Sequence, residues 1–180
     1  DHFLSELADA TAQVRMLSRD QLLHCVSDAS TPLVVRHAAG NLLALIGDPR
    51  INTFAPDMIT ISGGIVRIGL EPEQVPRVLQ QFDKLGLNES WIKKECPRHQ
   101  VKLSPFRIAR YPVTHQEYRD FLLDTGYPEL PDSWTFRRFP AERANHPVYT
   151  VSASAGDAYA AWLSAKTGRQ FRLPTEAEWE

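Results

Sequence analysis

The sequence predicts a protein of the α+β class, with an α-helical segment over residues 1–56 followed by a mixed region over residues 57–180. In the first fifty residues, apolar side chains recur every three or four positions, as they do along amphipathic helices. From residue 57, the stretch "MITISGGIVRIG" alternates apolar and polar side chains, a pattern typical of strands. Helical spacing then returns further along the chain, so helices and strands are mixed in this second region.

Three helices are expected before residue 50. The apolar positions of the first helix are Phe3, Leu4, Leu7, Thr11, Val14, Met16 and Leu17. Ser18 with Gln21 forms a capping box, which opens a second helix. Thr31 is expected to cap the third helix, with Pro32 at its first helical position and Gly47 at its end.

Strands are expected next. Residues 58–69 are predicted to form two short strands joined by a tight turn at Gly63 and Gly64. A helical pattern covers residues 75–85, and further extended segments are interrupted by Pro105 and Pro112.

Two further helices are well specified. Thr114 and Glu117 form a capping box at the start of one helix, and Ser154 with Asp157 is expected to do the same for another. Between them, residues 127–147 form a proline-rich loop. We expect this loop to be irregular but ordered, because three aromatic side chains in it need burial: Trp134, Phe136 and Phe139.

Composition and charge exclude several classes of protein. The 180 residues are 43% apolar and 23% charged, as in ordinary globular chains, and the net charge of −2 argues against nucleic-acid or anionic-lipid partners. No apolar run is long enough to span a membrane. Two cysteines are too few for a disulfide framework, and no charged-then-apolar leader opens the chain. We therefore expect a cytoplasmic location.

Candidate site residues are few, and none has a pattern that predicts catalysis. Cys96 and His99 have ligand-like spacing, but a structural zinc ion needs four ligands, so no metal site is predicted. The middle of the chain combines basic and aromatic side chains that could bind an anionic partner, although a solvated loop face also explains them. These candidate binding residues are Arg110, Tyr111, Trp134, Phe136, Arg137 and Arg138.

The segment "TPLVVRHAAGNLLALIGDPR" resembles one helix of a HEAT-like repeat. A single repeat cannot bury its apolar face alone, which would require neighbouring repeats. The alternative is that these helices pack on the domain that follows. Both interpretations remain open at this point.

Three phrases from residue 57 onward resemble, in order, the domains of the formylglycine-generating-enzyme (sulfatase-modifying-factor) family. "MITISGGIVRIG" is similar to the family's "M..IPGG.F.MG", and "CPRHQVKLSPFRIARYPVTHQEYRDFL" to "E.P.H.V.L..F.I...PVTN..Y..F". "HPVYTVSASAGDAYAAWLSAKTGRQFRLPTEAEWE" resembles "HPV..VSW.DA.AY..W.....G...RLPTEAEWE". The chain departs from these patterns at Ser62, His115 and Ala153, where proline, asparagine and tryptophan are usual.

The resemblance implies a C-type-lectin-like fold of which this chain is the N-terminal portion. Thr175 and Glu178 cap a helix that has only five residues here, and a helix so short needs additional length. We therefore expect a longer polypeptide, and we expect Trp162 and Trp179 to share one compact unit. The oxidase members of the family use a cysteine pair that resembles a copper(I) site, which Cys25 and Cys96 do not match. No cofactor is expected in this portion, although copper or calcium could belong to the complete domain.

The sequence therefore favours a ligand- or partner-binding module of a larger bacterial multidomain protein, such as a conflict, defence or signalling protein, that is non-catalytic in this portion. The expected partner is another protein or the C-terminal remainder of the same domain. The alternative is a copper-dependent formylglycine-generating oxidase that acts on a sulfatase cysteine.

Overall fold

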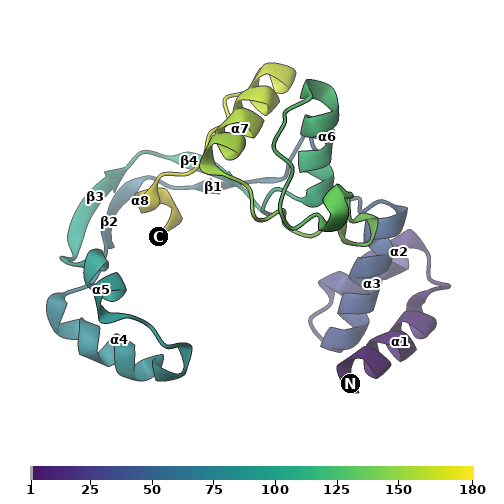
Figure 1. Ribbon diagram of the computed structural model, residues 1–180, viewed down its shortest axis with the longest axis horizontal. Coiled ribbons are helices and arrows are strands. Elements are labelled where there is room, and N and C mark those ends of the chain that lie inside the picture. The colour runs from purple at the N-terminus through teal and green to yellow at the C-terminus, as the bar shows by residue number, and fades with distance from the viewer. Residues whose placement is uncertain (1) are drawn as a thin grey trace. The chain divides into compact units, whose positions relative to one another are not determined.

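The computed structural model describes residues 2–180 and divides the chain into two compact units (Figure 1). Unit 1 contains the chain up to Asp57 together with Ala109–Leu173. Unit 2 contains Met58–Ile108 and Pro174–Glu180. The expectation that Trp162 and Trp179 share a unit is wrong, because the chain passes from unit 1 to unit 2 between Leu173 and Pro174.

Three helices open unit 1: α1 (His2–Val14), α2 (Arg19–Ser27) and α3 (Leu33–Ile46). The capping box before α2 is confirmed, since the Gln21 amide donates to Ser18 Oγ at 3.3 Å and the Ser18 amide donates to Gln21 Oε1 at 2.8 Å. The predicted cap of α3 is wrong. Pro32 itself holds the cap position, and its carbonyl accepts the first helical hydrogen bonds, so Thr31 lies one residue outside the helix.

Helices α1 to α3 share an apolar core. Its buried side chains are Ala10, Val14, Leu22, Ala38, Ala39 and Leu43. Half of them are alanines, whose small side chains let helix backbones approach closely. Cys25 packs at the edge of this core as a half-buried free thiol.

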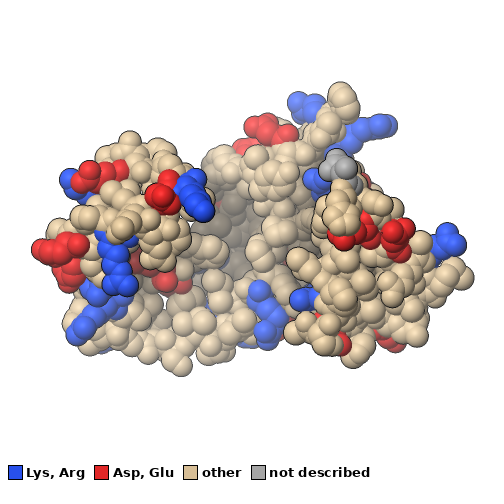
Figure 2. All heavy atoms as spheres, turned by 90° about the horizontal axis from the view of Figure 1, so that it is seen from below, with Lys and Arg blue, Asp and Glu red and all other residues tan. Residues whose placement is uncertain are grey.

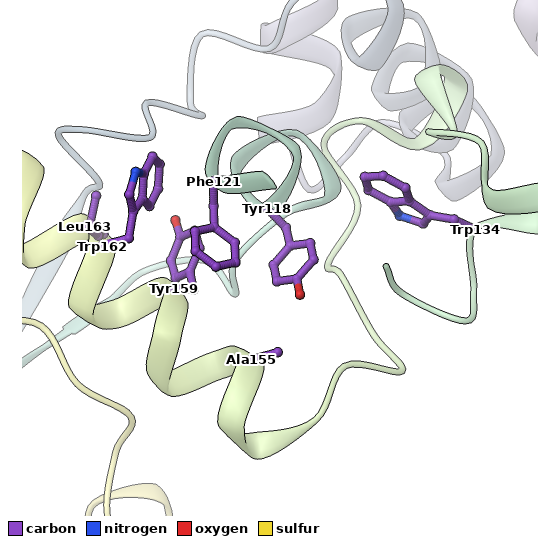
Figure 3. Close-up of a cluster of buried hydrophobic side chains, with 7 residues drawn as sticks. All are labelled: Tyr118, Phe121, Trp134, Ala155, Tyr159, Trp162 and Leu163. Atoms are coloured by element: carbon purple, nitrogen blue, oxygen red, sulfur yellow. The ribbon is translucent and has the colours of Figure 1, made fainter. Parts of the chain in front are cut away.

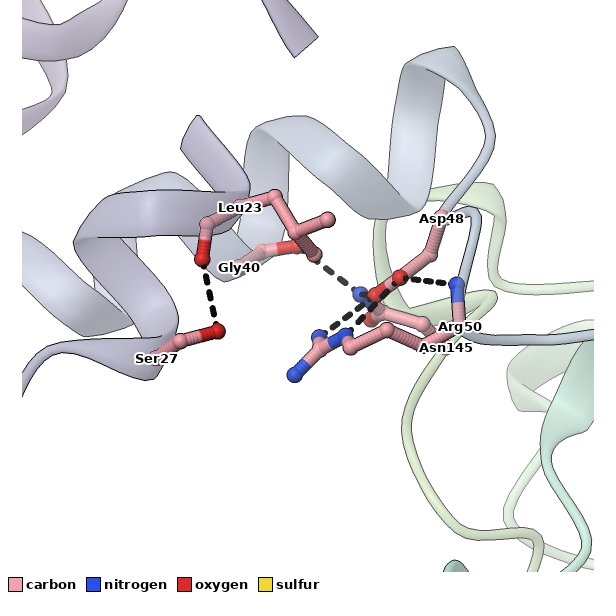
Figure 4. A network of polar contacts seen from close by, with 6 residues as sticks. All are labelled: Leu23, Ser27, Gly40, Asp48, Arg50 and Asn145. Carbon is pink, nitrogen blue, oxygen red and sulfur yellow. Dashed lines mark hydrogen bonds and ion pairs between the residues drawn. The ribbon is translucent and has the colours of Figure 1, made fainter. Parts of the chain in front are cut away.

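A polar network joins the end of α3 to the loop before α7 (Figure 4). The buried Asp48 carboxylate accepts from the Arg50 guanidinium at 2.6 and 2.9 Å and from Asn145 Nδ2 at 2.8 Å. The same amide nitrogen of Asn145 donates to the Gly40 carbonyl at 3.0 Å. These bonds support the second interpretation of the helical segment, in which it packs on residues that follow it.

The second core of unit 1 lies between α6 (His115–Thr125) and α7 (Ala153–Thr167) and is largely aromatic (Figure 3). Its buried side chains are Tyr118, Phe121, Trp134, Ala155, Tyr159, Trp162 and Leu163. The Phe121 ring lies 5.2–5.8 Å, between centroids, from the rings of Tyr118, Tyr127, Tyr159 and Trp162. Such tilted aromatic pairs add to the stabilisation that burial alone provides.

The cap of α7 differs from the prediction. Ser152, and not Ser154, accepts the Ala155 amide at 3.1 Å, and Asp157 lies inside the helix. Glu129 explains the choice, since its carboxylate accepts from the Ser152 amide at 2.6 Å and from its hydroxyl at 2.7 Å. The end of the helix at Gly168 is confirmed.

The strands of unit 2 do not form the predicted hairpin. Instead, β1 (Met58–Ile61) pairs with β4 (Phe106–Ala109), and β2 (Gly64–Ile68) pairs antiparallel with β3 (His99–Leu103). The two glycines lie where the chain passes from one ladder to the next. A Cβ on Gly63 would lie 2.7 Å from the Leu103 carbonyl oxygen and from Pro105. Glycine is therefore required at this position by close backbone approach and not by a turn.

Short helices complete unit 2: α4 (Val75–Gln81), α5 (Glu89–Ile92) and α8 (Glu176–Trp179). The capping box at Thr175 and Glu178 is confirmed, with the Thr175 amide donating to the Glu178 carboxylate at 2.8 Å. Within the unit, the Glu180 carboxylate accepts the Gly69 amide at 2.6 Å. Single 3₁₀ turns occur in both units, at 72–74, 83–85, 93–95, 135–137 and 141–143.

The surface carries charges of both signs. On the face shown in Figure 2, basic and acidic side chains are interspersed without one dominant sign. Among residues 2–180, every helix is too short or too polar to cross a bilayer.

Candidate functional site

Unit 1 contains a cavity of about 410 Å³ beside the N-terminus of α6. Apart from His115, the cavity-lining residues come from the loop that joins α6 to α7. They are His115, Ser133, Thr135, Arg138, Phe139, Pro140, Glu142, Arg143 and Tyr149. Because Tyr149 is half exposed, the cavity opens to solvent.

His115 is fixed in place by the backbone around it. Its amide donates to the His146 carbonyl at 2.9 Å, and the preceding Thr114 forms a β-bridge with Pro147. Thr114 also takes part in the confirmed capping box of α6, with the Glu117 carboxylate. The His115 side chain is consequently only 1% exposed.

A single hydrogen bond sets the tautomer of His115. Trp134 Nε1 lies 2.8 Å from His115 Nδ1, and an indole N–H can only donate. Nδ1 must therefore accept, which places the proton of the neutral ring on Nε2. Among the described residues Nε2 has no hydrogen-bond partner, so its N–H is available to a molecule in the cavity.

The pKa of His115 lies below its ordinary value of 6.5, because burial disfavours the charged ring and because His146 and Arg143 lie near it. Burial likewise lowers the pKa of His146. The unfolded chain therefore takes up protons near pH 6.5 that the folded chain does not, and we expect the free energy of unfolding to fall as the pH drops below about 6.5.

This pH dependence can be measured by urea unfolding between about pH 5 and 7. His115→Asn keeps an acceptor for Trp134 but removes the titrating ring, so its stability should change less with pH than that of the parent chain. An equally steep change in the variant would show that His115 does not contribute.

The charged groups of the cavity are mostly cationic. Arg138 and Arg143 both line it, and neither has a carboxylate within ion-pair distance among residues 2–180. Glu142 is the acidic residue of the lining. When His115 is neutral, the two arginines and Glu142 give the cavity lining a net charge of +1.

The loop around the cavity is strained. Within the described part of the chain, the non-glycine residues with positive φ are Phe136 (53°), Arg137 (57°) and Thr150 (59°), and each adjoins a cavity-lining residue in the sequence. Thr150 is held in this conformation by amides that donate to it, from Ser133 at 2.7 Å and from Asp132 at 3.3 Å. Backbone strain of this kind persists where the surroundings enforce it, often at binding sites.

The structure brings part of the predicted set together. Arg138 lines the cavity, and Trp134 lies buried behind it as the partner of His115. The expected burial of Phe136 is wrong, because its left-handed backbone turns the side chain outward and leaves it 89% exposed. Arg137 is exposed beside it.

The remaining predicted residues lie elsewhere in unit 1. Arg110 forms an ion pair with Asp57, and the Tyr111 ring contacts the Arg50 guanidinium at 5.7 Å. The prediction omitted several cavity residues: His115, Glu142, Arg143 and Tyr149. The departure from the family pattern at position 115 was the signal that could have identified the first of these.

Metal chemistry has little support from the side chains that are described. Cys25 lies in unit 1 and Cys96 in unit 2, both as free thiols. Across residues 2–180, three or more His, Cys, Asp or Glu side chains do not gather in an arrangement that could hold a metal ion.

Comparison with known proteins gives relatives with several different names. A formylglycine-generating enzyme of Thermomonospora curvata is 30% identical over 166 residues, which cover 70% of this chain and 48% of the relative. A hercynine oxygenase of Mycobacterium tuberculosis is 36% identical over 115 residues, 49% of this chain and 26% of the relative. The serine/threonine-protein kinase Pkn1 of Chlamydia trachomatis is 33% identical over 102 residues, 49% of this chain and 16% of the relative.

The chain thus spans between a quarter and a half of the length of the first two of these relatives. The family model describes a domain that these differently named relatives share. Residues 47–180 match the sulfatase-modifying factor enzyme 1-like domain, and the chain belongs to that family.

Proposed function

We propose that this chain is a ligand-binding module of a larger bacterial protein, non-catalytic in this portion, and that the cavity at His115 is its binding site. The observation that carries the proposal is a cavity lined by the His115 ring, whose Nε2–H has no hydrogen-bond partner among residues 2–180, and by two arginines that form no ion pair with those residues. A bound acceptor can take a hydrogen bond from Nε2–H and pair with the guanidinium groups.

The charge of the cavity indicates its ligand. Arg138 and Arg143 outweigh Glu142 by one charge, so a group with a single negative charge fits better than a doubly charged one. A carboxylate matches guanidinium geometry and can also accept from His115 Nε2. The ligand class we propose is a monoanionic carboxylate.

The relatives support a module that occurs in different proteins. The family domain is found in proteins named as an oxygenase, a formylglycine-generating enzyme and a kinase. We include in the proposal the C-type-lectin-like fold that the family implies, a cytoplasmic location, and a role in conflict, defence or signalling.

A partner polypeptide is also part of the proposal: either another protein or the C-terminal remainder of the same domain. Large apolar side chains of unit 2 are exposed, among them Trp179 at 74% and Trp91. Burying such aromatic area against a partner would be strongly favourable.

The test is carboxylate binding by the full-length protein, with acetate and benzoate as probes and calorimetry or NMR titration as the measurement. Replacing both Arg138 and Arg143 by alanine should weaken binding at least about tenfold, because charge-assisted hydrogen bonds are lost. Arg15→Ala with Arg77→Ala removes the same charge from two exposed positions, one in the turn after α1 and one on α4, and should leave binding unchanged. Equal affinity in both double variants would refute the proposal.

The alternative function is a copper-dependent formylglycine-generating oxidase, favoured by the relative of that name. The residues described here do not fit a copper(I) pair, since the two cysteines belong to different compact units. The test is incubation of the full-length protein, copper and oxygen with a cysteine peptide derived from a sulfatase. Formation of formylglycine, seen by mass spectrometry, would establish the oxidase and contradict a purely binding role.

A further inference from the structure

We infer that the cavity and the adjacent Phe136 side chain together form a docking surface for an acidic peptide segment of a partner protein. A carboxylate of the peptide enters the cavity, and an apolar side chain two positions away rests on the Phe136 ring. The inference rests on the proposed function, because it assigns the carboxylate to a peptide.

Phe136 is exposed next to Thr135, which lines the cavity. It is the most exposed of the large apolar side chains that the structure describes. Two positions before it, Trp134 is buried, and two positions after it, Arg138 is exposed and lines the cavity. The Phe136 side chain therefore lies exposed at the rim of the cavity, while the buried Trp134 anchors the loop.

The backbone conformation that exposes Phe136 has an energetic cost. Phe136 and Arg137 are consecutive residues in the left-handed region, and each such residue costs about 1–3 kcal/mol. The turn is closed by the Arg137 amide, which donates to the Trp134 carbonyl at 2.8 Å, and by the Arg138 amide, which donates to the Thr135 carbonyl at 3.1 Å. An aromatic ring held outward by a strained turn is suited to contact a partner.

The charge of the loop around Phe136 favours an acidic partner. The loop segment 132–143 contains three arginines against two acidic residues, and Arg137 adds to the two arginines of the cavity. The acidic residues are Asp132 and Glu142. Net positive charge beside an exposed aromatic ring selects an acidic segment with an apolar residue.

The position of Phe136 outside the cavity favours a peptide ligand over a small molecule. Phe136 does not line the cavity, so a small carboxylate inside it leaves the ring unused. In an extended peptide, side chains two positions apart lie on one face, about 7 Å apart. A peptide can therefore fill the cavity and cover the ring at once.

The experiment is selection of a random nine-residue peptide library, displayed on phage, against the full-length protein. We expect selected peptides to share a Glu or Asp with an apolar residue two positions away. Phe136→Ala should weaken a selected peptide about tenfold in fluorescence anisotropy and leave acetate binding unchanged. Leu123→Ala, an exposed change on α6, should have no effect on either. Glu→Gln or Asp→Asn in the peptide should also abolish most of its affinity.

The outcomes separate the two proposals. Unchanged peptide affinity in Phe136→Ala, or no acidic enrichment, overturns the inference while carboxylate binding that depends on Arg138 and Arg143 keeps the proposed function. If the double arginine variant still binds both acetate and the selected peptide with unchanged affinity, the proposed function and the inference are both overturned. Binding of phosphatidylserine vesicles without any peptide selection would indicate a membrane surface and also overturn the inference.

Discussion

Phe121→Ala is expected to lower the free energy of unfolding of unit 1 by about 3–5 kcal/mol, the cost of removing a fully buried phenylalanine from a packed core. Phe121 is 2% exposed and contacts four other aromatic rings between α6 and α7 (Figure 3). The surrounding rings are too rigid to close the cavity left behind. Urea unfolding followed by tryptophan fluorescence should show a midpoint lower by about 2 M.

Leu123→Ala is the matched control for this change. Leu123 lies on the same helix but is 72% exposed, so the same kind of truncation should shift the midpoint very little. Equal shifts for both variants would mean that the aromatic cluster is not the stabilising core of the unit.

Gly69→Ala is expected to disrupt unit 2. Gly69 has φ of 82°, and a Cβ there would lie 2.5 Å from the Glu95 carbonyl oxygen. That oxygen accepts the Leu70 amide at 2.8 Å, so the added methyl group must displace it and break the bond. Left-handed strain and the lost hydrogen bond together cost about 3 kcal/mol. Hydrogen exchange of the Leu70 amide should accelerate about a hundredfold.

Gly86→Ala provides the comparison. Gly86 has a similar positive φ of 63°, but a Cβ there would meet no atom within 4 Å. Only the conformational cost remains, about 1 kcal/mol. If the Leu70 amide exchanged at the same rate in both alanine variants, close contact with Glu95 would not be the cause of the faster exchange.

The local elements were predictable because short-range chemistry determines them. The capping boxes that begin at Ser18, Thr114 and Thr175 all form, since both partners of each box lie within four residues. The local pattern predicts a cap at Ser154, whereas the structure has it at Ser152, because the deciding partner, Glu129, lies 23 residues from Ser152 and cannot be found from local spacing.

The strand pairing was not predictable in the same way. A pair of glycines between alternating segments indicates a hairpin turn, but Gly63 is needed where backbone from residues 103–105 approaches it. Two segments about forty residues apart make this contact, and a single sequence does not show which distant strands pair. The exposed position of Phe136 was missed because its strained backbone depends on neighbours brought together by folding.

Some residues of the candidate site could be predicted from the sequence, and others could not. Trp134 and Arg138 were selected for their residue type, and both belong to the cavity region. His115 was interpreted as a local departure at a helix start. Its role depends on Trp134, whose indole reaches it from 19 residues away.

The pairing of β2 with β3 has a consequence for self-association. Each ladder has only two strands within residues 2–180, so their outer edges expose unpaired backbone groups to which a second copy could add. Arg67 and Lys102 stand exposed on these edge strands. A second copy in register would bring these positive charges close together, so we expect them to oppose edge-to-edge pairing.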